Sequence, residues 1–127
     1  MRNPALDGSL MAIERRRDPR IPVRRRVRIE IEGFEGEITL LDISPGGFGI
    51  STSELVSGDA RKVVRFLAQD GRWVLTLAAK VVHMRLCEDK EKGGPLYLVG
   101  LAFTDLQEPA VNRVVDQLLE RIAGVLV

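Results

Sequence analysis

Apolar and polar residues alternate with a period of two along much of this chain, which is typical of strands with one buried face and one solvated face. The clearest example begins at Val27, where apolar residues at every second position are separated by charged ones. Further short apolar segments follow, separated by turn-forming residues. The pattern predicts six strands, at residues 22–32, 37–43, 48–53, 61–68, 72–86 and 96–104.

Glycine, proline and aspartate mark the predicted turns between these strands. Residues 33–36 are bracketed by glycines and predict a hairpin turn, and Asp70-Gly71 is a strong hairpin signal. Residues 44–47 form a turn by composition, because Pro45 fixes one dihedral angle and a following glycine permits a positive φ. Residues 87–95 are charged and glycine-rich, which predicts a surface loop.

The periodicity changes after the last strand. Apolar residues recur there at intervals of three and four, which makes one stripe of an amphipathic helix: Val111, Val114, Val115, Leu118, Leu119 and Ile122. Glu108 and Pro109 suit its first turn, and Gly124 suits its end. The expected fold class is therefore mainly β, a six-stranded antiparallel barrel with a C-terminal α-helix covering one opening.

Length and composition limit the possibilities. A chain of 127 residues with 45% apolar residues can bury one core. No apolar run approaches the ~20 residues of a membrane span, and the first residues lack the apolar region of a secretory signal, so we expect a cytoplasmic protein. Cys87 is the single cysteine and cannot form an internal disulfide. Residues 1–13 are predicted to be a flexible leader to one domain over residues 14–124.

The charged residues are distributed unevenly along the chain, which bears on the kind of partner it binds. The net charge is +1, but residues 15–28 hold eight arginines and one aspartate. A basic segment on a mildly acidic body points to one anionic partner. A solvated basic strand without a partner is the alternative that charge alone leaves open.

The arginines of this segment suit a nucleotide ligand. A guanidinium group is always charged, donates two hydrogen bonds at once and stacks on flat rings. It can meet both acceptors of guanine, O6 and N7, in one plane, and it also pairs with phosphate. Arg16 and Arg20, four residues apart, could therefore hold one nucleotide from both sides.

The segment that begins at Asp42 offers the complementary chemistry. A carboxylate can accept hydrogen bonds from guanine N1–H and N2–H together, and the Ser44 hydroxyl can donate to a phosphate. Gly46 and Gly47 let a ligand approach the backbone closely. Taken alone, Asp42 and Ser44 could simply bind the backbone of their own turn.

Arg16-x-x-x-Arg20 followed by Asp42-x-Ser44-x-x-Gly47 resembles the two-part signature of PilZ domains. Gly100-Leu101-Ala102-Phe103 is similar to that family's Gly-x-x-Phe ending, and the resemblance covers about residues 14–122. It implies the family's barrel fold and a cyclic di-GMP ligand.

The resemblance also implies roles for single residues. Arg16 and Arg20 would bind guanine edges and phosphates, Asp42 would read the guanine edge, Ser44 would assist, and Gly47 would keep the turn open. Arg15 precedes the arginine motif and could stack on a second base, which favours a stacked pair of ligands.

The implied function is that of a single-domain receptor that signals to an unidentified effector protein in motility, pilus formation, exopolysaccharide synthesis or transcription. Two alternatives stay open, a nucleic-acid-binding barrel and a protein adaptor without ligand. The basic segment has no aromatic residue to stack on bases, so nucleic acid is not the expected partner. His83 is predicted to be a packed strand residue. With one histidine and one cysteine we expect no zinc site, and with no plausible nucleophile–base pair we expect no enzyme.

Overall fold

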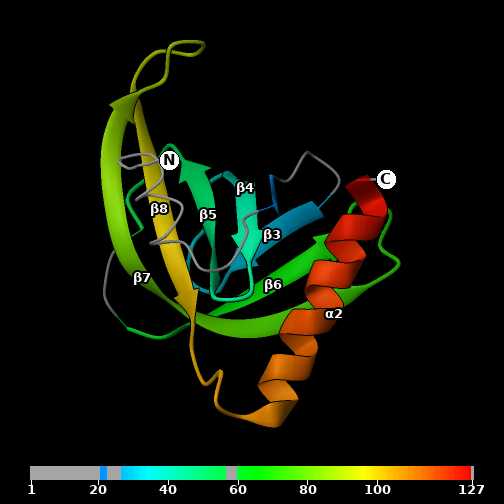
Figure 1. Ribbon diagram of the computed structural model, residues 1–127. Coiled ribbons are helices and arrows are strands. Elements are labelled where there is room, and N and C mark those ends of the chain that lie inside the picture. Colours follow the sequence, from blue (N-terminus) through cyan, green and yellow to red (C-terminus); the bar gives the residue numbers. More distant parts are fainter. Residues whose placement is uncertain (1–20, 23–26, 57–59, 127) are drawn as a thin grey trace, which may run out of the picture.

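The computed structural model describes residues 21–22, 27–56 and 60–126. They form one antiparallel sheet in the order β2-β4-β5-β8-β7-β6-β3, followed by a helix (Figure 1). The predicted leader at residues 1–13 lies outside the described residues, and so does Gly58-Asp59, a pair of turn-forming residues between the third and fourth predicted strands. The elements are β2 (Ile21–Pro22), β3 (Val27–Ile31), β4 (Ile38–Ser44), β5 (Gly47–Thr52), β6 (Lys62–Ala68), β7 (Val74–Glu88), β8 (Pro95–Phe103) and α2 (Pro109–Leu126).

The sheet curls until its last strand, β3, lies beside β4, and the result is a nearly closed barrel (Figure 1). The predicted antiparallel barrel with a C-terminal helix is therefore confirmed. The short strand β2 is an addition to the six predicted strands, because the sequence pattern had placed Pro22 at the start of the first one. In β3, buried and exposed residues alternate as predicted.

The predicted hairpin at residues 33–36 is wrong in its pairing. The chain does turn there, with Gly33 at a φ of 81° and the Phe34 amide donating to the Ile31 carbonyl at 3.0 Å. However, β3 forms its ladder with β6, where Ile29 lies opposite Phe66. The two ladders of β4 are with β5 and with β2. The seam between β3 and β4 therefore stays open.

Three phenylalanines form the centre of the core. The ring centroids of Phe48 and Phe66 lie 5.1 Å apart, and Phe103 lies 5.5 Å from Phe48. The Phe48–Phe66 pair is edge-to-face, and aromatic contacts of this geometry add to the free energy of burial. The predicted helical stripe completes this core through Val115, Leu118 and Ile122, all of which are buried.

The helix begins at Pro109, as predicted, but continues past Gly124 to Leu126. Glycine permits the left-handed conformation that ends helices but does not impose it, and the next two residues, Val125 and Leu126, do not break a helix. Within the described residues, no helix is both long and apolar enough to cross a membrane.

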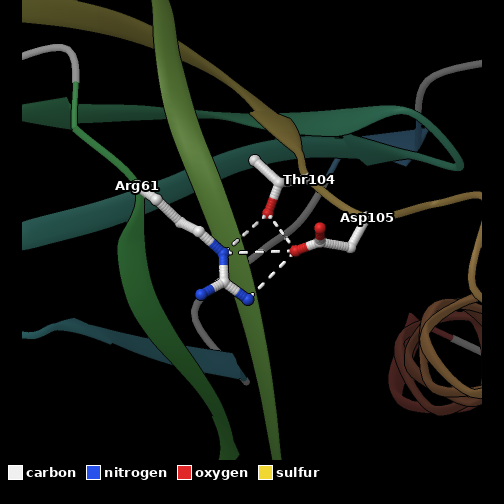
Figure 2. Close-up of polar contacts among 3 residues, drawn as sticks. All are labelled: Arg61, Thr104 and Asp105. Atoms are coloured by element: carbon white, nitrogen blue, oxygen red, sulfur yellow. Dashed lines mark hydrogen bonds and ion pairs between the residues drawn. The ribbon is translucent and has the colours of Figure 1, made fainter.

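A polar cluster fixes the corner between β8 and α2 (Figure 2). Arg61 Nε donates to Thr104 Oγ1 at 3.3 Å and to Asp105 Oδ2 at 3.2 Å, and Arg61 Nη2 lies 3.0 Å from the same carboxylate oxygen. Asp105 has a φ of 63°, a conformation that aspartate tolerates better than most residues. These contacts connect the residue before β6 to the segment that leads from β8 into α2.

The β7–β8 hairpin is longer than predicted, because β7 runs through Glu88 and β8 begins at Pro95. The predicted loop at 87–95 therefore shrinks to six residues. The Asp89 carboxylate accepts hydrogen bonds from the amides of Glu91 at 2.9 Å and Lys92 at 3.1 Å. These bonds lower the pKa of Asp89 below its ordinary value of 3.8, the Lys92 amide being the larger cause.

The aromatic core leads to a stability prediction. Phe66→Ala should lower the free energy of unfolding by about 3–5 kcal/mol, because it removes a fully buried ring and leaves a cavity. Urea unfolding measures the difference. Phe34→Ala is the matched control, since Phe34 is only partly buried at the edge of the core. Equal losses for the two variants would contradict a core centred on the phenylalanine cluster.

The hairpin tip leads to a prediction about pH. A carboxylate whose folded pKa is depressed stabilises the fold above its ordinary pKa and stops doing so as the pH falls through the folded value. The amide resonances of Glu91 and Lys92 should therefore shift together on acidification, with a midpoint below 3.8. In Asp89→Asn, the acid-induced shift of these two amide resonances should be absent. A midpoint above 3.8 in the wild type would show that the two amides do not stabilise the charged carboxylate of Asp89.

Candidate ligand-binding site

The turn at residues 44–47 connects β4 to β5 and is bound tightly to β8. Ser44 is 5% exposed, and its Oγ donates to the Gly47 carbonyl at 3.4 Å. The Gly46 carbonyl accepts a hydrogen bond from the Phe103 amide at 2.9 Å. The first of these bonds is buried and the second joins the turn to the end of β8, so three of the four residues in this turn contribute to the structure of the barrel.

Gly47 has a packing role that the sequence did not reveal. A Cβ at this position would lie 2.1 Å from the Leu101 carbonyl oxygen, a backbone atom that cannot move aside. The expectation of a positive φ in this turn is wrong, because neither Gly46 nor Gly47 adopts one. Glycine is needed at residue 47 because β5 and β8 approach closely there.

Asp42 lies just before this turn on the outer face of the barrel and is partly exposed. The register of the β4–β5 ladder shifts between Leu40 and Asp42, after which Asp42 lies opposite Gly49. A Cβ at Gly49 would be 3.0 Å from Asp42 Oδ1, so the carboxylate leans over this glycine. On its other side, Asp42 is paired with Pro22 of β2.

The row of residues continues from Gly49 across β8 to β7. Gly49 lies opposite Gly100, and Gly100 lies opposite His83. A Cβ at Gly100 would be 2.3 Å from His83 Nε2, so the imidazole covers this second glycine. The prediction that His83 is packed inside is wrong: it is exposed on the outer face. The register shifts between Val81 and His83, which turns the histidine outward.

These residues surround a hollow of about 520 Å³ on the outside of the barrel. Its polar groups are the Asp42 carboxylate, the His83 imidazole and the Arg85 guanidinium. The rest of its lining is Leu41, Gly49, Ile50, Leu98, Val99 and Gly100. An apolar floor with a few polar groups at the rim suits a flat heterocycle with donors on one edge and acceptors on another.

The structure thus separates the predicted site residues into two groups. Asp42 faces the hollow, whereas Ser44, Gly46 and Gly47 form the turn that supports it. The predicted ligand-binding residues Arg15, Arg16 and Arg20 lie outside the described residues.

Sequence reasoning missed two residues of the hollow, His83 and Arg85. They stand two apart on β7, a spacing that places both on one face of a strand. Nothing in that spacing connects them to Asp42, because the connection depends on the register of three ladders. As for metals, the described part of the chain has no cluster of histidine, cysteine or acidic side chains that could hold one.

The two glycines beside this site should differ in what they tolerate. Gly47→Ala should lower the free energy of unfolding by about 1–3 kcal/mol, because its methyl group meets backbone. Gly49→Ala should cost much less, because the side chain of Asp42 can rotate away. Thermal and urea unfolding of the two variants measure this contrast. A Gly49→Ala variant as unstable as Gly47→Ala would contradict the distinction.

Comparisons with known proteins identify the family and the fold of the chain. The sequence model of the PilZ domain matches residues 14–121. Among solved structures, the fold is similar to the PilZ domain of YcgR from Escherichia coli, described as a structure with c-di-GMP, with a TM-score of 0.67 and 16% identity over 88% of this chain and 94% of that one. No curated protein matches the chain in sequence.

A second similar fold is MrkH of K. pneumonia, in a structure described as its c-di-GMP complex. The TM-score is 0.60 and the identity 22%, over 82% of this chain. The chain spans about half of MrkH, 50% in this structure and 51% in another, whose description calls MrkH a transcription regulatory factor dependent on c-di-GMP. Because the family match extends over most of the sequence, this chain is a member of the PilZ domain family.

Proposed function

We propose that this protein is a receptor for cyclic di-GMP, not an enzyme. The observation that carries the proposal is the pairing of β2 with β4. Ile21, the residue that follows Arg20 in the sequence, lies opposite Ile43, and Pro22 lies opposite Asp42. The residues that directly follow Arg20 therefore pair with the edge of β4, beside Asp42.

The chemistry of the two motifs is complementary to a guanine nucleotide. Asp42 accepts hydrogen bonds from guanine N1–H and N2–H, a pair of donors that adenine does not present on its corresponding edge. Arg16 and Arg20 bind the phosphates and guanine edges of the ligand. Arg15 stacks on a second base, which favours a stacked pair of ligands per chain.

Ser44 and the glycines act mainly through the turn. Ser44 is buried and bound to Gly47, so its contribution is to hold the backbone that positions Asp42. The relatives support the choice of ligand, because the structures of the YcgR domain and of MrkH are both described with c-di-GMP.

Ligand binding acts by changing the surface that the protein presents to its effector. Ligand binding joins the arginine segment to the outer face of β4 through charge-assisted hydrogen bonds, a recognised way of switching a protein. The altered face then engages or releases an effector protein. Motility, pilus formation, exopolysaccharide synthesis and transcription are the processes in which we place that effector.

Calorimetry with cyclic di-GMP tests the proposal. We expect saturable binding by the wild type, and a loss of about ten- to a hundredfold in affinity for Asp42→Asn, because this change removes a charged acceptor and leaves its shape. Arg16→Ala and Arg20→Ala should weaken binding at least as much. A stoichiometry near two ligands per chain would support the stacked pair.

Three controls separate this reading from its alternatives. Asp116→Asn, an exposed change on α2, should bind like the wild type. GMP and cyclic di-AMP should compete poorly. Equal binding of all three nucleotides with a steep dependence on salt would instead indicate a nucleic-acid binder, and no binding of cyclic di-GMP would refute the receptor.

A further inference from the structure

The outer face of β7 carries two basic side chains that neither signature motif includes. His83 and Arg85 line the same hollow as Asp42 but approach it from the opposite side. We propose that they form the second wall of the ligand site and bind the acceptor edge of the guanine whose donor edge Asp42 binds. This inference rests on the proposed function, since it concerns the same ligand.

The first support is the spacing across the sheet. Between Asp42 on β4 and His83 on β7 lie two strands, and the facing positions on both are glycines, Gly49 and Gly100. With neighbouring strands about 4.8 Å apart, the backbones of β4 and β7 are separated by about 14 Å. That gap accommodates a purine between two side chains, whereas a Cβ on either intervening strand would project into it.

The second support is the direction of the side chains. The carboxylate of Asp42 leans over Gly49, and the Nε2 end of His83 leans over Gly100. Because the two glycines are directly paired, the acid and the imidazole extend toward each other from opposite sides. A base bound between them is contacted on two edges at once.

The third support is the distribution of charge. Among the described residues, Asp42 is the only acidic one that lines the hollow, and His83 and Arg85 are the basic ones. Within the described parts of the chain, neither basic side chain has a hydrogen bond or an ion pair with another residue. Arg85 is exposed, so its forked donors can turn to a ligand without breaking an existing contact.

This arrangement selects guanine over adenine. The Watson–Crick edge of guanine gives two donors to Asp42, while its O6 and N7 accept from the guanidinium of Arg85 or from the His83 imidazole. Adenine would present an acceptor, N1, to the carboxylate and a donor, N6, to the basic wall. Both mismatches disfavour binding, so the second wall contributes to selectivity as well as affinity.

Calorimetric titration of variants with cyclic di-GMP tests the second wall. His83→Ala and Arg85→Ala should each weaken binding about tenfold, the effect of losing one base contact. Gly100→Ala should weaken it similarly, because the new methyl group displaces the His83 ring. Arg113→Ala on α2 is the control for the loss of one positive charge at an exposed position, and it should bind like the wild type.

A second measurement does not depend on any substitution. His83 is the only histidine of the chain, so a carbon–proton NMR spectrum contains one imidazole spin system. Saturating cyclic di-GMP should shift it through the ring current of the bound base, and an equal concentration of cyclic di-AMP should leave it nearly unchanged. Should a variant fail to fold by circular dichroism, this signal in the wild type decides the question.

The outcomes distinguish the two proposals. If the wild type binds, Asp42→Asn does not, and the β7 variants bind normally with an unmoved imidazole signal, the second wall is overturned while the receptor stands. If the wild type does not bind cyclic di-GMP, the receptor and the second wall are both overturned. Weakened binding by the β7 variants with a shifted imidazole signal supports the second wall.

Discussion

The register of four neighbouring strands is the constraint on which the site depends. Along the row Asp42, Gly49, Gly100 and His83, each ladder must be aligned to the residue for the two polar side chains to face each other over two glycines. A slip of one residue in any ladder would exchange the faces of a strand. The site would then lose its floor or one of its walls.

The hydrophobic core sets this register. Phe48 and Ile50 flank Gly49, and Val99 and Leu101 flank Gly100, and all four of these apolar side chains are buried. A slip would expose them and place the glycines inside, which would cost several kcal/mol of apolar burial. The outer face is therefore as well defined as the inner one, although it makes few contacts of its own.

The motif Asp42-x-Ser44-x-x-Gly47 connects the barrel to the candidate site. Its serine and glycines are held to β8 by the bond from Phe103 to Gly46 and by the close approach of Gly47 to Leu101. Asp42 alone among its residues turns to the hollow. A motif that the sequence analysis treats as one ligand-binding unit thus consists of one side chain that faces the hollow and a framework that keeps it in place.

Sequence periodicity was sufficient for most of the strands and for the amphipathic helix, because alternation and helical spacing follow from local geometry. The Asp70-Gly71 pair was sufficient for the turn between β6 and β7. Local sequence patterns failed where tertiary contacts choose among local options. The hairpin at residues 33–36 was wrong because β3 takes β6 as its partner. The burial of His83 was wrong because the register shift after Val81 reverses the face. The helix end at Gly124 was wrong because glycine only permits a stop.

The amino-acid sequence by itself determined where polar side chains are concentrated, namely a dense set of arginines and one carboxylate before a tight turn. It also determined an alternation that buries one face of the strand at Val27–Ile31. Only the tertiary structure decided that His83 and Arg85 share a hollow with Asp42, and that Gly47 is required by packing. The physical reason is that residue types and spacings are local, whereas cross-strand neighbours follow from how the whole sheet closes around its core.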